Sequence, residues 1–313
     1  MVTKDDVKLA VQPNSSLTPG FAYFNDTFRD AVKGGVFNAS EKGFVSGASG
    51  KEFTIFRGFT GRCSWCKTPL QSVNYAACHD NNTLYDRLTL SADKGSDLAA
   101  MNRLAAAITL TSDGIPFMMS GEEMLRSKKN ADGTFNENSY NAGDAVNALD
   151  YSTLSDGNIK TVNDYYKGLI EFRKAHLALR ATDVAVIDKA VKRIEGIGKN
   201  IVGIAIDGTQ IAGETASSIF VVFNADTADA NVELPEGKWG IYVNDTTAGT
   251  KRLKTVSGKV NVKGISAMVL IKEGEGSVVN PWLIAGIAGA GVVLAAALFV
   301  ILFGRKKNPK KDK

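Results

Sequence analysis

An uncharged apolar run near the C-terminus constrains this chain more than any other feature. Residues 282–303 read WLIAGIAGAGVVLAAALFVILF, with no charged side chain in 22 positions. As a helix that rises 1.5 Å per residue, this run would reach about 33 Å, close to the roughly 30 Å hydrocarbon thickness of a bilayer. We therefore expect one transmembrane helix over residues 281–303; a helix buried in a soluble core is the alternative.

A basic tail follows the apolar run. Residues 304–313 read GRKKNPKKDK and hold six cations and one anion, which account for much of the net charge of +4. Because cationic flanks stay in the cytoplasm, we expect a single-pass cell-membrane protein with its bulk outside the cell. No basic patch interleaved with aromatic residues indicates nucleic-acid binding. The N-terminus lacks an apolar signal segment, which favours an incomplete chain over one exported by its anchor.

Apolar strand patterns alternate with helical patterns up to about residue 180. Buried strands are expected at 71–78 and 115–119, and helices at 98–110, after Asp97 as N-cap, and at 162–179. Polar residues follow the strands, which is typical of an α/β barrel. Only two to three such units are present, so residues 1–180 are predicted to be the C-terminal part of a (β/α)8 barrel.

The pattern changes after residue 180. Short β-rich runs, from VAVIDK at 184–189 to AMVLIK at 267–272, are separated by Gly, Asp and Asn. Such spacing predicts an antiparallel β-sandwich over residues 181–273, with 274–280 as a linker. The predicted fold class is α/β: the C-terminal portion of a (β/α)8 barrel, then an antiparallel β-sandwich and one C-terminal transmembrane helix.

Three cysteines are too few for a disulfide framework. Cys63 and Cys66 are spaced to close one small bridge or to form half of a zinc site. There is no second CxxC and the chain has only two histidines, so metal binding is the weaker interpretation and no metal site is predicted.

The strand at 71–78 ends in His79, Asp80 and Asn81. An imidazole, a carboxylate and an amide would thus lie together at a barrel rim, where barrel enzymes keep their active sites. Alone the tripeptide is weak evidence, because Asp and Asn commonly cap helices. At the start of the chain, Asn25 or Asp26 is expected to cap a short helix, with Arg29 holding charges together at the rim.

Four longer blocks add a family resemblance. They are FNDTFRDAVKGGVF (24–37), VNYAACHDNNTLYDRL (73–88), GIPFMMSGEEMLRSK (114–128) and NSYNAGDAVNALDY (138–151). In this order they resemble the C-terminal third of the catalytic barrel in type I pullulanases, which are α-glucan debranching enzymes of the α-amylase superfamily. The resemblance covers about residues 18–180, and the β-rich region agrees with the domain that closes such enzymes.

The resemblance implies roles for particular residues. Asp80 matches the carboxylate that stabilises the transition state, and His79 and Asn81 are expected to bind the same sugar. Asn138 and Tyr140 are expected to border the cleft, as substrate-binding residues on a long loop. Adjacent Glu122 and Glu123 point in different directions, which favours a structural role. The nucleophile and the general acid of the family come from earlier strands, so we expect this chain alone to be inactive.

The sequence therefore predicts part of a retaining glycoside hydrolase that cleaves α-1,6 branch linkages in pullulan, starch or glycogen outside the cell, anchored through the C-terminal helix. Its partners would be an α-glucan and the membrane, with no nucleic acid. No cofactor is predicted; calcium and the oligomeric state stay open. The alternatives are a non-catalytic surface module that binds glucan or docks a partner, and a related α-glucan hydrolase of different bond specificity. The coding sequence upstream of Met1 would discriminate the enzyme from the module.

Overall fold

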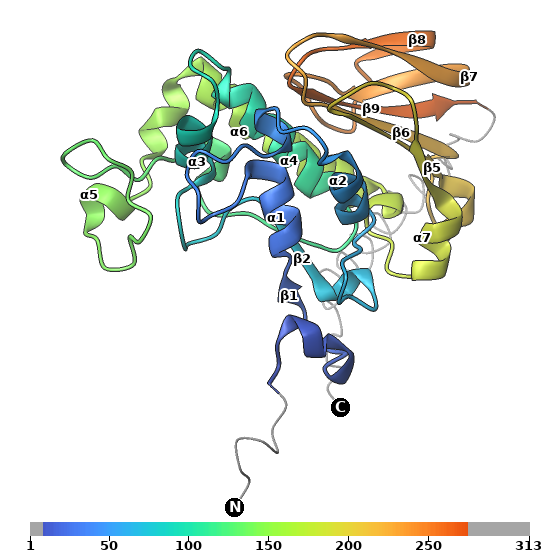
Figure 1. Cartoon of the computed structure of the whole chain (residues 1–313). Coiled ribbons are helices and arrows are strands. Elements are labelled where there is room, and N and C mark those ends of the chain that lie inside the picture. The colour runs from blue at the N-terminus through green and yellow to red at the C-terminus, as the bar shows by residue number, and fades with distance from the viewer. Residues whose placement is uncertain (1–8, 275–313) are drawn as a thin grey trace, which may run out of the picture. The chain divides into compact units, whose positions relative to one another are not determined.

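The computed structural model describes residues 9–274, and its elements are arranged as a helical part and a β-sheet part (Figure 1). The helices are α1 (Asp26–Lys33), α2 (Glu52–Phe59), α3 (Leu84–Ser91), α4 (Leu98–Thr111), α5 (Asp144–Asn147), α6 (Gly157–Ala175) and α7 (Val184–Ala190). The strands are β1 (Tyr23–Phe24), β2 (Ser72–Tyr75), β3 (Ile115–Phe117), β4 (Val191–Ile194), β5 (Ile201–Asp207), β6 (Ser218–Asn224), β7 (Ala230–Val243), β8 (Lys254–Val262) and β9 (Ser266–Glu273).

The first three strands form a small parallel sheet in the order β1-β2-β3. Tyr23 pairs with Ser72, and Val73 with Ile115, so consecutive strands lie side by side. Helices separate the strands along the chain, as in successive βα units. Both predicted strands, at 71–78 and 115–119, are present but shorter than predicted. Because the strands are parallel, their carboxyl ends share one edge of the sheet.

Helices α4 and α6 pack side by side and begin at local caps. The side chain of Asp97 accepts a hydrogen bond from the Ala100 amide at 2.9 Å, so the predicted N-cap of α4 is confirmed. The second predicted helix, at 162–179, instead begins earlier, at Gly157, where Asp156 is the cap. Arg173 of α6 donates to three carbonyl oxygens at the end of α4, those of Leu110, Ser112 and Gly114. These bonds satisfy carbonyls that the end of a helix leaves without partners.

The remaining strands form one antiparallel sheet in the order β4-β5-β6-β9-β7-β8, which corrects the predicted two-sheet sandwich. Phe220 and Val222 on one face belong to a cluster made only of residues from this region, which also includes Trp239 of β7. Since no helix of the described residues joins this cluster, the sheet covers that face by its own curvature. A register shift between Glu233 and Lys238 bends β7 and permits the curl.

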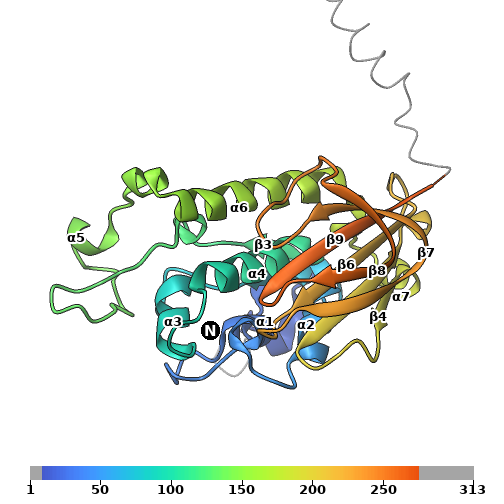
Figure 2. The same cartoon turned by 90° about the horizontal axis from the view of Figure 1, so that it is seen from above.

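Residues 184–189 (VAVIDK), predicted as a strand, form helix α7. Asp183 explains the difference, because its side chain accepts from the amides of Ala185 and Val186 as a helix N-cap. The opposite face of the sheet packs on the helices: the rings of Phe59 and Phe223 lie 6.2 Å apart. Figure 2 shows α4 beneath β9 and β6, seen from above.

A membrane-spanning helix is not supported. Across residues 9–274, no helix is long and apolar enough to cross a bilayer. The 19-residue α6 is long enough but carries charged side chains such as Lys160, Asp164 and Lys167. The predicted helix at 281–303 lies outside the described residues. The predicted fold class is therefore corrected to a mixed α/β fold with an antiparallel sheet, and the predicted single-pass localisation at the cell membrane is corrected with it.

Candidate functional site

The carboxyl ends of β1, β2 and β3 bring a set of polar and aromatic side chains to one edge of the parallel sheet. Asn25 and Asp26 follow β1, Tyr75 ends β2, and Phe117 ends β3. The Phe24 ring contacts both Tyr75 and Phe117 edge-on, with ring centres 4.8 and 5.2 Å apart. We call this edge the rim.

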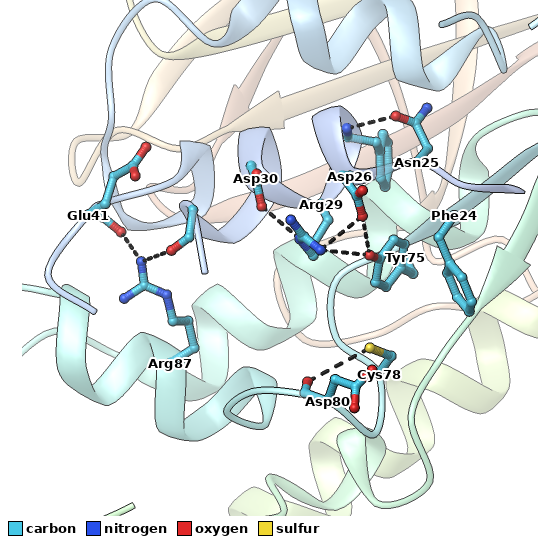
Figure 3. A network of polar contacts seen from close by, with 12 residues as sticks. Phe24, Asn25, Asp26, Arg29, Asp30, Glu41, Tyr75, Cys78, Asp80 and Arg87 are labelled. Carbon is cyan, nitrogen blue, oxygen red and sulfur yellow. Dashed lines mark hydrogen bonds and ion pairs between the residues drawn. The ribbon is translucent and has the colours of Figure 1, made fainter. Parts of the chain in front are cut away.

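A hydrogen-bonded network occupies the rim beside β2 (Figure 3). Arg29 donates to Asp26 at 2.9 Å, to Asp30 at 2.7 Å and to the Tyr75 hydroxyl at 2.9 Å. The Tyr75 hydroxyl in turn donates to Asp26 at 2.7 Å. Burial raises the pKa of Tyr75, and its bond to Asp26 raises it further, so Tyr75 is a neutral donor. Asn25 caps α1, as predicted, and Arg29 holds the charges of the rim together.

His79 and Asp80 extend from the rim into solvent. Their side chains are 79% and 70% exposed, and His79 Nε2 lies 3.4 Å from Asp80 Oδ2. Asp80 does not turn into the protein interior, so its carboxylate is free to meet a ligand. In the described part of the chain, no hydrogen bond or ion pair links Asp80 to the network of Arg29. Figure 3 shows it on the loop beyond the end of β2.

Asn81 is half-buried and shapes the loop that carries these two residues. Its φ of 63° lies in the left-handed region, which asparagine tolerates better than most residues. Directly after it, Asn82 is buried and Thr83 caps α3 by accepting from the Asp86 amide at 3.1 Å. The turn thus fixes where His79 and Asp80 leave the strand.

Asn138 and Tyr140 lie on the excursion between the 3-10 turn η5 (Glu122–Met124) and α6, which projects beyond α3 in both views (Figures 1 and 2). Tyr140 is 81% exposed. Ser139 between them is buried, where it accepts from Lys128 Nζ at 2.6 Å. The Asn147 amide donates to the Ser139 and Ala142 carbonyls, both at 2.7 Å. The loop is ordered by these bonds and presents Tyr140 outward, apart from the ends of the strands.

Glu122 and Glu123 serve the structure of the 3-10 turn η5 (Glu122–Met124) after β3. Glu122 is buried; Tyr166 and Asn102 lie against it, with Tyr166 OH 3.0 Å from Glu122 Oε1. Burial raises the pKa of Glu122 to about 7, although the bond from Tyr166 opposes the shift. Glu123 accepts from the Gly121 amide at 3.0 Å. Neither carboxylate faces the other across an open space.

Sequence patterns missed Tyr75 and the buried Lys33. Burial, with the nearby charges of Arg29 and Arg87, lowers the pKa of Lys33 to about 8. Lys33 ends a short helix, where a cation ordinarily faces solvent, so the sequence offers no sign of its burial. For Tyr75, the available signal was an aromatic side chain within the predicted strand at 71–78; in the structure it pairs directly with Phe117.

The structure also shows how the cysteines are paired and whether acidic residues gather as metal ligands. Cys63 and Cys66 form a disulfide, which resolves the alternatives left open for them. Cys78 is a free thiol. Among residues 9–274, no group of three or more His, Cys, Asp or Glu is arranged to hold a metal ion.

Similar proteins are found by both sequence and structure, although no family model matches. The pullulanase of Bacillus subtilis (strain 168) is 36% identical over 188 residues, covering 58% of this chain and 25% of the relative. The isoamylase of Flavobacterium sp. is 28% identical over 283 residues, covering 72% of this chain and 34% of the relative.

Solved structures of pullulanases are also similar to this chain. The pullulanase from Bacillus acidopullulyticus superposes with a TM-score of 0.75 at 35% identity, over 81% of this chain and 30% of that chain. A pullulanase from Paenibacillus barengoltzii in complex with maltohexaose and alpha-cyclodextrin gives 0.74 at 34% identity, over 85% and 41%.

These similarities relate the chain to pullulanases and to an isoamylase. The chain is similar to pullulanases over most of its length, and the resemblance predicted from the sequence blocks is confirmed. The chain spans only about a quarter of the length of the Bacillus subtilis pullulanase.

Proposed function

We propose that this chain contributes the parallel strands β1, β2 and β3 and the antiparallel sheet to a hydrolase that cleaves α-1,6 linkages in branched α-glucans such as pullulan, starch or glycogen. One observation carries the proposal: Asp80 is exposed at the carboxyl end of a parallel strand, in a chain that is pullulanase-like around that strand. Solved relatives hold maltooligosaccharides, which supports an α-glucan as the ligand.

Asp80 would act as an assistant to bond cleavage. Glycosidases of the retaining type pass through an oxocarbenium-like transition state, and hydrogen bonds that strengthen in that state accelerate the reaction. We propose that Asp80 accepts hydrogen bonds from the hydroxyls of the reacting sugar. His79 would bind the same sugar, and Asn81 would hold the turn and contact it.

The nucleophile and the general acid would come from polypeptide outside this chain. A retaining pair must lie about 5 to 5.5 Å apart on opposite faces of the sugar. Near the rim, Glu122 is buried against Tyr166 and Glu123 is held by the Gly121 amide. Neither is placed for this role, which supports a chain that does not hydrolyse glucan alone.

Asn138 and Tyr140 would contribute to a more distant part of the glucan site. The exposed ring of Tyr140 offers a flat apolar face on which a glucose ring could stack, and the Asn138 amide offers a donor and an acceptor. Since the loop projects beyond α3, a contact there requires a glucan of several units.

Binding of maltohexaose tests the proposal. In a nuclear magnetic resonance titration of the 15N-labelled chain, the amide signals of His79 and Asp80 should shift with the sugar. Replacing Asp80 by Asn removes a charged acceptor, which should weaken binding by about tenfold.

A matched control is Asp93→Asn, which removes an exposed carboxylate paired only with Lys42. It should leave the affinity for maltohexaose unchanged. The proposal fails if the shifts avoid the end of β2, or if both variants bind the sugar as the unaltered chain does.

A further inference from the structure

A second site candidate lies around the end of α2, away from His79 and Asp80. Arg57 and Arg62 both line three cavities, of about 160, 450 and 80 Å³. Lys67 lines the smallest of the three, and Lys192 and Arg193 line the largest. We call the five cations Arg57, Arg62, Lys67, Lys192 and Arg193, with the three neighbouring cavities that they line and that share Arg57 and Arg62, the basic groove.

Positive charge dominates the basic groove. Asp188 is the one carboxylate among the residues that line these three cavities, and it already forms an ion pair with Arg62. That leaves four cations in excess. Like charges gathered in a hollow focus a positive potential, which raises the local concentration of anions.

Several donors in the basic groove are unused. Within residues 9–274, the guanidinium of Arg57 makes no hydrogen bond or ion pair. Arg193 contacts Glu195 at 3.5 Å through Nη1, while its buried Nε has no partner. The Arg57 guanidinium lines all three cavities, so its donors can meet an incoming oxyanion directly.

The frame of the groove is fixed before any ligand arrives. Arg62 joins the loop after α2 to α7 through Asp188 and through the Val184 carbonyl at 3.4 Å. The Cys63–Cys66 disulfide follows directly. Figure 1 shows α2 beside the loop that leads to β2. Preorganised donors bind an anion with little loss of conformational entropy.

One wall of the largest cavity is apolar. Phe53 is 57% exposed there, beside Phe56, Ile187 and Val191. A ligand for this cavity should therefore combine an anionic group with an apolar or ring-shaped body. The hollow is confined, whereas a nucleic-acid backbone needs an extended stripe of cations.

We propose that the basic groove binds the phosphoryl group of a small phosphate monoester. Guanidinium groups match phosphate oxygens in a planar, two-pronged geometry, and Arg57 and Arg193 supply free donors for it. The body of the ester packs on Phe53. His79 and Asp80 line none of these three cavities, and of the rim residues named above Asn25 alone lines one, the cavity of about 160 Å³.

Calorimetric titrations with two probes test this site, at low ionic strength because salt screens exposed charges. Inorganic phosphate measures the anion contact alone, and phenyl phosphate adds a ring. Both should bind in a saturable manner, and phenyl phosphate more tightly. If inorganic phosphate does not saturate, or binds as tightly as phenyl phosphate, the proposal is overturned.

Variants locate the site. Arg57→Gln and Arg193→Gln should each weaken binding of both probes by about tenfold, as expected for losing a charged hydrogen bond. Arg252→Gln is the matched control. It also removes one positive charge, but Arg252 pairs with Glu273 outside the groove. If all three variants weaken phosphate binding equally, the loss follows from net charge alone and the proposed binding site is contradicted. Phe53→Ser should weaken phenyl phosphate binding only; weakening of both probes alike would refute the apolar contact.

Discussion

At the scale of single residues, Glu122 shows how burial sets charge. Tyr166 OH lies 3.0 Å from both Glu122 Oε1 and Asn102 Oδ1, but it has one proton to donate. When Glu122 is protonated, it can donate to Tyr166, which then donates to Asn102; when Glu122 is ionised, Tyr166 donates to it and Asn102 Oδ1 loses that donor. The protonated arrangement agrees with burial, which raises the pKa of Glu122 to about 7.

The raised pKa makes stability depend on pH. The pKa of Glu122 is 4.5 in the unfolded chain and about 7 in the folded chain. Between these two pH values the folded state therefore keeps a proton on Glu122 that the unfolded state has lost. The free energy of unfolding should therefore fall as pH rises from about 4.5 to about 7, by an amount on the order of 3 kcal/mol. Glu122→Gln keeps a donor to Tyr166 and should remove this contribution.

Urea unfolding at several pH values between 4 and 8 provides the check. Asp113 is also buried with a raised pKa, of about 8, and remains in both proteins. The informative quantity is therefore the difference in the free energy of unfolding between the chain and its Glu122→Gln variant at each pH. A difference that does not change with pH would show that Glu122 is ionised throughout.

Local residue roles were the most predictable from sequence. Asp97 and Asn25 cap helices through bonds to amides three residues away, which sequence spacing alone specifies. The burial of Lys33, and the bond between Tyr75 and Asp26, depend on segments distant in the chain. No local pattern reports such contacts.

At the scale of elements, the fit of α6 against the loop after β7 depends on a glycine. A Cβ at Gly168 would lie 1.9 Å from the Ala248 carbonyl oxygen, so only hydrogen fits there. The contact joins a helix of the helical part to the β-sheet part. Arg103 of α4 adds a bond to the Asp245 carbonyl at 2.8 Å nearby.

Gly168→Ala should therefore destabilise the chain by about 1–3 kcal/mol, as expected for overpacking. Gly157→Ala is the matched control in the same helix, because no atom lies within 4 Å of its Cβ position. That change should be neutral or slightly stabilising. Thermal unfolding would measure both; an unaltered melting temperature for Gly168→Ala would mean that the helix and loop separate freely.

Element types were predictable where one period dominated, and boundaries less so. The alanine-rich pattern at 98–110 predicts α4 closely, because helical propensity and burial agree there. Residues 184–189 are rich in valine and isoleucine, which favour strands, but the Asp183 cap and packing of Ile187 make them helical. Tertiary contact overrides propensity in such short segments.

At the scale of the whole molecule, the helices and the sheet share one hydrophobic core. A single cluster runs from Phe28 and Phe59 through α4 and α6 to Val221 and Phe223 of β6. The predicted division at residue 180 stays a prediction, but each side of it would expose this core if the other were removed.

Deleting residues 181–274 should therefore abolish cooperative folding of the remaining helical part. The apolar faces of α4 and α2 would lose the sheet that covers them. Circular dichroism during heating would report the result: a broad, non-cooperative change is expected. A sharp transition would show that residues 1–180 form an independent domain.

The overall arrangement was only partly predictable. The parallel strands followed from the alternation of apolar runs and helices, whereas the single curled sheet did not. The same alternating strands fit a two-sheet sandwich, and the order in which they pair, which makes one six-stranded sheet, depends on contacts distant in the chain. The apolar run at 282–303 was the strongest local pattern, yet its predicted helix lies outside the described residues.

The central claim is that Asp80 assists at a sugar-cleaving centre whose nucleophile and general acid belong to other polypeptide. Release of reducing ends from pullulan by the purified chain, and by its Asp80→Ala variant, measures this most directly. We expect no turnover above background from either protein. Turnover by the chain that the Asp80→Ala change abolishes would contradict the claim, because the complete catalytic set would then lie within these 313 residues.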